Sequence, residues 1–112
     1  MPNSSRDKIR HFIADVIDTA DWHEYGRRRA ITRDAVPLFL WYYGHGIDAP
    51  GMLIDRMVEQ FEDHHLDWSE KALELAKKRV IPLVVSIMLD KVKDMPRDEV
   101  AVLGEKAQAF LK

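Results

Sequence analysis

The sequence predicts an all-α protein, a compact bundle of five or six helices in a single domain that spans residues 1–112. Apolar residues recur at helical spacing along nearly the whole chain. Prolines and glycines divide this pattern into segments of helix length. Residues 80–89 carry no charge and are apolar on every side, so other helices or a partner must cover them. We therefore expect the helix around Pro82 to lie at the centre of the bundle.

The first helix is predicted over residues 5–20, because Ile9, Ile13 and Val16 recur on one side of a helix. Residues 21–31 lose this period and contain a glycine and three consecutive arginines. A polar connection is expected there.

The second helix is predicted to begin at Thr32 or Asp34, because each side chain offers an oxygen to the free N–H groups of a first helical turn. Pro37 would then fall in or near that first turn, where its missing N–H costs little. The Gly-His-Gly sequence at residues 44–46 should end the helix.

Prolines also mark the starts of the third and last helices. Asp48 followed by Pro50 predicts a helix that ends near His64 or His65, and Pro96 opens the last helix. Between them, Asp67 with Glu70 marks the start of a long helix over residues 69–93. Its apolar stripe stays in phase across Pro82, which favours one kinked helix over a break into two.

Composition narrows the class of protein. The chain has no cysteine, a net charge of −2, 46% hydrophobic residues and 32% charged residues. These values are typical of a folded protein with no general attraction to anionic partners. Its ten-residue uncharged stretch is far shorter than the roughly 18 residues needed to span a bilayer. We expect a cytoplasmic protein without disulfides and without a membrane partner.

No catalytic or cofactor motif stands out. The nearest approach to a metal site is one Glu-x-x-His pair, Glu62 with His65, whereas a di-iron site in a helical bundle uses two such pairs and further carboxylates. No nucleophile elbow, phosphate-binding loop or dinucleotide fingerprint is present. We therefore expect a protein that is not an enzyme and binds no metal or cofactor.

Six consecutive large residues, 38–43, turn through about 500° of a helix and so cover its whole circumference. A bundle of this size already has residues 80–89 to enclose. We predict that part of the segment is a partner-binding surface, and its candidates are Leu38, Trp41, Tyr42 and Tyr43. The alternatives are that the rings pack against the chain itself, or that the outer side of residues 80–89 is the interface.

Charge is segregated along the chain. Residues 48–70 hold seven acids and one base, a net charge of −6, whereas residues 71–93 hold six bases and two acids, a net charge of +4. One interpretation is that these segments pack antiparallel with their opposite charges facing each other. The other is an acidic surface for a basic partner, on one helical face, formed by Asp55, Glu59, Glu62 and Asp63.

These patterns predict a small protein–protein interaction module, an adaptor, regulator or inhibitor. Its partner would be another protein or a second copy in a homodimer. The alternative is a nucleic-acid-binding regulator that contacts phosphates through a basic cluster, which comprises Arg27, Arg28, Arg29 and Arg33. The acidic third helix is unsuited to the role of a DNA recognition helix, because phosphates would repel it.

Overall fold

The computed structural model describes residues 4–20 and 27–110, and within them it contains helices and no strand. The all-α bundle is confirmed. The helices are α1 (Ser4–Thr19), α2 (Arg27–Gly44), α3 (Pro50–His64), α4 (Glu70–Leu75), the π-helix η1 (Ala76–Val80), α5 (Ile81–Val92), α6 (Arg97–Ala107) and the 3₁₀ helix η2 (Gln108–Phe110). Of the helices in this described part, none is long and apolar enough to cross a membrane.

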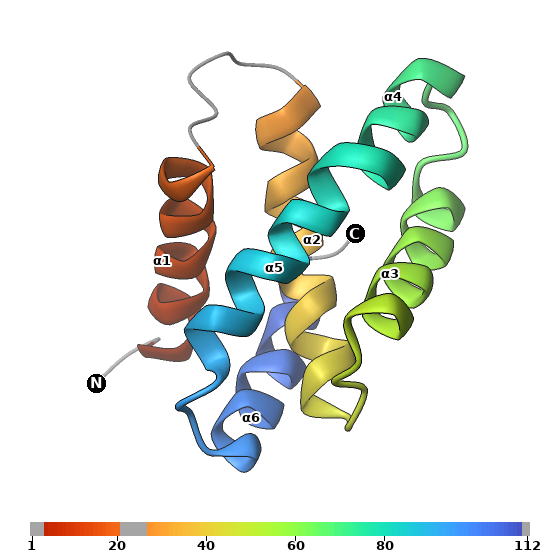
Figure 1. Cartoon of the computed structure of the whole chain (residues 1–112). Helices are drawn as coiled ribbons and strands as arrows, with labels where there is room; N and C mark the ends of the chain where they lie inside the picture. The colour runs from red at the N-terminus through yellow and green to blue at the C-terminus, as the bar shows by residue number, and fades with distance from the viewer. Residues whose placement is uncertain (1–3, 21–26, 111–112) are drawn as a thin grey trace.

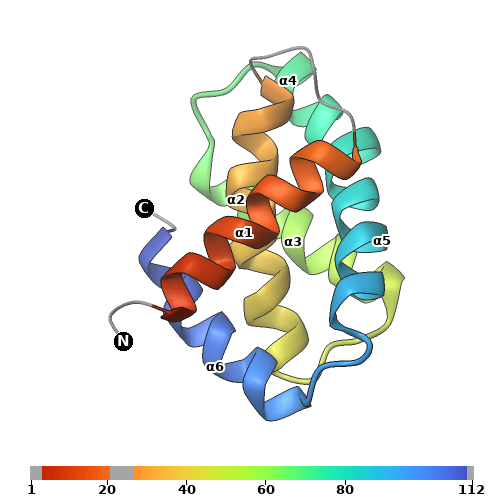
Figure 2. The ribbon, with the colours of Figure 1, turned by 90° about the vertical axis from the view of Figure 1, so that its left-hand side faces the viewer.

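The centre of the bundle is α2, which packs against α1, α3, α5 and α6 (Figures 1 and 2). The sequence assigned that place to the helix around Pro82. In the structure α5 crosses the bundle with one side open, and both Leu83 and Ser86 are exposed. Among the described residues, the neighbours of α5 lie on its inner side, so the uncharged stretch 80–89 is buried on that side and exposed at Leu83 and Ser86.

The start of α2 corrects the sequence prediction. The helix begins at Arg27, so neither Thr32 nor Asp34 caps it, and Pro37 lies in its interior. Thr32 is fully buried, and its hydroxyl donates to the carbonyl oxygen of Arg28 at 2.8 Å. Arginine and alanine favour helix, and burial of the following apolar residues outweighs the one backbone bond that the proline removes. Residues 21–26 of the expected connection lie outside the described part of the chain.

The long helix does continue through Pro82, as predicted. α4, η1 and α5 follow one another without a gap, and Figure 1 shows them as one diagonal rod. The backbone is helical at Val80 (φ −75°, ψ −52°) and at Ile81 (φ −60°, ψ −47°). The π-helical turn η1 ends two residues before the proline, and its wider spacing relieves the clash between the proline ring and the preceding turn.

Helix ends that depend on local sequence agree with the predictions. α3 begins at Pro50 and ends at His64, and Pro96 directly precedes α6. Ser69, rather than Asp67, caps α4 by accepting a bond from the N–H of Ala72 at 3.2 Å.

α2 and α6 approach so closely that their backbones touch. A Cβ atom on Gly104 would lie 2.6 Å from the carbonyl oxygen of Leu40 and 3.0 Å from the Cα of Trp41. A Cβ atom on Gly44 would lie 2.7 Å from the Cα of Ala101. Only hydrogen fits at these two positions, so the glycines determine both the separation of the two helices and the rotation of α2 about its axis.

We predict that Gly104→Ala lowers the free energy of unfolding by about 1–3 kcal/mol, because a helix backbone must move to admit the methyl group. The measurement is urea denaturation followed by circular dichroism.

The matched control is Gly51→Ala at the start of α3, where an added Cβ atom meets nothing within 4 Å. Alanine restricts the unfolded chain there and should raise the free energy of unfolding by roughly 0.4–1 kcal/mol. Equal effects of the two substitutions would contradict the close packing of α2 against α6.

Candidate functional site

The aromatic segment of α2 is divided between the core and the surface. Leu38 and Tyr43 are 4% and 9% exposed, and Phe39 and Leu40 are fully buried, whereas Trp41 and Tyr42 remain half-buried. The ring of Tyr43 stacks on Phe39 with a centroid distance of 5.4 Å. Of the four predicted contact residues, the chain itself therefore covers two, and the available surface is formed by Trp41 and Tyr42.

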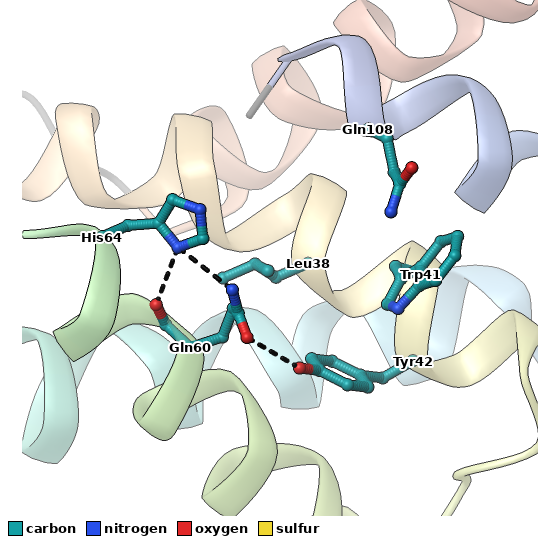
Figure 3. Close-up of a pocket in the computed structure, with 6 residues that line it drawn as sticks. All are labelled: Leu38, Trp41, Tyr42, Gln60, His64 and Gln108. Carbon is teal, nitrogen blue, oxygen red and sulfur yellow. Dashed lines mark hydrogen bonds between the residues drawn. The ribbon is translucent and has the colours of Figure 1, made fainter. Parts of the chain in front are cut away.

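These two side chains lie at a pocket of about 390 Å³ between α2, α3 and η2 (Figure 3). The described residues that line it come from three segments that are distant in sequence. They are Leu38, Trp41 and Tyr42 from α2, Gln60 and His64 from α3, and Gln108 from η2.

Hydrogen bonds connect the polar side chains on the α3 side of the pocket. The Tyr42 hydroxyl donates to Gln60 Oε1 over 3.5 Å, a long contact. His64 Nδ1 lies 3.2 Å from Gln60 Nε2 and 3.0 Å from the Gln60 carbonyl oxygen, and the histidine tautomer decides which of them it pairs with. Tyr42, Gln60 and His64 therefore form one connected polar edge.

The ring of His45 packs against the indole of Trp41. The two rings lie 4.0 Å apart between centroids, and His45 Nδ1 is 2.7 Å from the carbonyl oxygen of Trp41. His45 Nε2 is also 3.6 Å from a carboxylate oxygen of Glu105 on α6. These contacts restrict the orientation of the indole before any partner arrives.

The four acids predicted on α3 do not behave alike. Glu62 accepts from Lys77 Nζ at 3.1 Å, an ion pair that joins α3 to η1. Asp55, Glu59 and Asp63 are exposed, and no ion pair is formed by them within the described residues. The antiparallel pairing of opposite charges therefore applies at Glu62, while the other three carboxylates face solvent.

The carboxylates of α3 act electrostatically on the Tyr42 hydroxyl at the pocket. Burial raises the pKa of the Tyr42 hydroxyl above its usual value of 10.0, and the neighbouring Glu59 carboxylate raises it further. Arg56 opposes this shift of the pKa, and Asp63 adds a smaller increase. The aromatic and acidic surfaces predicted separately thus meet at Tyr42.

The four arginines of the predicted basic cluster do not form one patch. The guanidinium of Arg27 lies 4.4 Å from the ring centroid of Trp68, beside the α3–α4 loop. Arg29 and Arg33 instead line a hollow of about 310 Å³ beside α1, together with Arg10. Arg28 is half-buried. The helical rotation between neighbouring residues directs these side chains to different sides of α2.

Glu62 and His65, the candidate metal-ligand pair, bind different partners in the structure. Glu62 binds Lys77, whereas His65 Nε2 lies 2.8 Å from Asp34 Oδ2. The His65 ring packs against both Phe61 and Trp68. Across residues 4–20 and 27–110, no group of three or more His, Cys, Asp or Glu side chains is placed to hold a metal ion.

No protein-family model, no curated protein and no solved structure matches this chain.

We predict that Tyr42 makes stability depend on alkaline pH. Because its pKa is raised in the folded state, its contribution to stability is fully present below about pH 10 and is lost as the pH rises through the folded-state pKa. Between about pH 9 and about pH 11, the wild type should therefore lose more stability than Tyr42→Phe does.

Chemical denaturation at a series of pH values measures this difference. Glu59→Gln should reduce it, because one cause of the raised pKa is removed. Parallel loss of stability in the wild type and in Tyr42→Phe would contradict the assignment.

Proposed function

We propose that this chain is a protein–protein interaction module that binds its partner at the α2–α3 pocket. The observation that carries the proposal is the position of Trp41 and Tyr42, two half-buried aromatic side chains beside a 390 Å³ pocket. Tryptophan and tyrosine dominate the energetics of many interfaces, since each buries a large area at a small cost in side-chain entropy.

The residues that pack against Trp41 also favour a protein-binding function. Gly104 packs against the backbone at Trp41, and His45 lies against its indole ring. A side chain that is already oriented loses little freedom on binding, which increases affinity for a given contact area. The exposed carboxylates of α3 would add electrostatic selection of the partner.

The module would act as an adaptor, regulator or inhibitor in the cytoplasm rather than as an enzyme. Among the described residues that line the pocket there is no serine, cysteine, threonine or lysine that could serve as an activated nucleophile. The partner would be a different protein or, as in a homodimer, a second copy of the chain.

We predict that Trp41→Ala combined with Tyr42→Ala removes most partner binding in an affinity pull-down from the native host, because both aromatic anchors are lost. Quantitative mass spectrometry compares the captured proteins. Sedimentation velocity at high micromolar concentration tests the homodimer in parallel, and there the double variant should be monomeric.

Leu83→Ala is the matched comparison, because Leu83 is an exposed apolar residue on the open side of α5. This variant should capture the same proteins as the wild type. Loss of capture by Leu83→Ala, with the double variant unaffected, would assign the interface to α5 and overturn the proposal.

A second candidate function is binding of nucleic acid through the hollow beside α1. Nucleic-acid binding is favoured because Arg10 of α1 lines the same hollow as Arg29 and Arg33 of α2. Three guanidinium groups at one site suit phosphate contacts that do not read sequence. Asp18 lines the same hollow and opposes an anion there.

If this second function is correct, affinity for a random DNA duplex should fall steeply as salt is added, since bound phosphates release counterions. Arg10→Glu with Arg33→Glu should abolish the binding in a fluorescence anisotropy titration, whereas Lys93→Glu, on an exposed lysine beyond α5, should reduce it only slightly. Absence of duplex binding even at low salt would exclude this function.

A further inference from the structure

We infer that the α2–α3 pocket receives a cationic side chain, arginine or lysine, from a basic segment of the partner protein. This inference rests on the proposed function and specifies the chemistry of the partner. Three properties of the site carry it: the charge around the pocket, the aromatic side chains at its edge and the hydrogen-bonding groups that line it.

Charge complementarity is the first argument. Asp55, Glu59 and Asp63 project from α3 into solvent without an ion pair among the described residues, whereas that helix carries a single arginine, Arg56, no lysine, and one histidine, His64, at its end. Glu59 and Asp63 act on the Tyr42 hydroxyl at the pocket itself. An incoming cation is therefore attracted, whereas an incoming carboxylate or phosphate is repelled.

The aromatic side chains supply the second argument. A guanidinium or ammonium group is attracted to the face of tryptophan or tyrosine. The chain already makes such contacts internally, because Arg27 lies 4.4 Å from the Trp68 centroid and Arg97 lies 4.3 Å from the Tyr43 centroid. Trp41 and Tyr42 offer the same kinds of ring at the pocket, and the edge of Leu38 offers apolar surface to the aliphatic stem of the cation.

The polar lining is the third argument. Gln60 Oε1 accepts only the long 3.5 Å bond from Tyr42 among the described contacts, so this oxygen retains capacity for another donor. Gln108 places a second amide at the pocket (Figure 3). A purely apolar anchor would leave Gln60 Oε1 with only its long bond and would add no partner for the Gln108 amide when it displaced water, whereas a cationic side chain can donate to both amide oxygens.

The test uses a fluorescein-labelled decapeptide of alternating arginine and glycine, with matched peptides that carry lysine, citrulline or glutamate in place of arginine. Anisotropy titrations at low ionic strength give the affinities. Citrulline has nearly the shape of arginine without its charge, so we expect the arginine and lysine peptides to bind on the order of tenfold more tightly than the citrulline peptide. The glutamate peptide should not bind.

Two variants locate the binding. Trp41→Ala should weaken arginine-peptide binding roughly tenfold through loss of the ring. Glu59→Gln with Asp63→Asn should weaken it as well and increase the relative affinity for citrulline, and both substitutions fall on exposed residues that leave the core intact. Asp90→Asn with Asp94→Asn is the control, because it removes the same charge from the end of α5 and from the turn after it, outside the pocket.

Equal affinity for the arginine and citrulline peptides would overturn the inference. So would an equal loss from the Asp90 and Asp94 control, since it would show attraction to net charge alone. If the pull-down still depends on Trp41 and Tyr42 in either case, the interaction module stands and only the cationic anchor is wrong. If the pull-down is insensitive to both aromatic residues, the proposed function itself fails.

Discussion

Two glycines bring the backbones of α2 and α6 into contact, and the rest of the bundle is arranged around this contact. Gly44 faces Ala101, and Gly104 faces the peptide unit of Leu40 and Trp41. Protein interiors are packed nearly as densely as organic crystals, so a contact without space for a methyl group determines helix position closely. The contact therefore determines how α2 is oriented about its own axis as well as its distance from α6. The helices α1, α3 and α5 pack on the remaining sides of α2.

The candidate site is a direct consequence of that rotation. Successive residues of a helix point about 100° apart, so six large side chains in a row cannot all face one neighbour. The core contains Leu38, Phe39, Leu40 and Tyr43. The side chains of Trp41 and Tyr42 instead lie at the pocket between α2, α3 and η2. The apolar surplus of residues 38–43 is thus mostly buried by the chain itself, and the part of this segment that remains accessible lies at the pocket.

Ion pairs add little stability to this arrangement. Glu62 with Lys77 and Asp48 with Arg97 join different elements at 3.1 and 3.3 Å, but such exposed pairs contribute at most about 1 kcal/mol each. Glu59 and Asp63, which form no ion pair among the described residues, raise the pKa of the Tyr42 hydroxyl. We propose that their position serves to attract a cation rather than to stabilise the fold.

The sequence alone determined the helical class, the end of α3, the continuation of the helix through Pro82 and the starts at Pro50 and Pro96. It also singled out Trp41, Tyr42, Glu59 and Asp63. These features depend on spacing within a few turns of chain, which periodicity and capping chemistry report directly.

Other features follow only from the packing of the helices against one another. These are the central place of α2, its start at Arg27 and the separation of the four arginines of the basic cluster. The same packing brings Gln60, His64 and Gln108 to the pocket. Each of these outcomes depends on distances between segments remote in sequence. Those distances follow from how closely two helices approach and how each is rotated, and a one-dimensional pattern of apolar residues contains neither quantity.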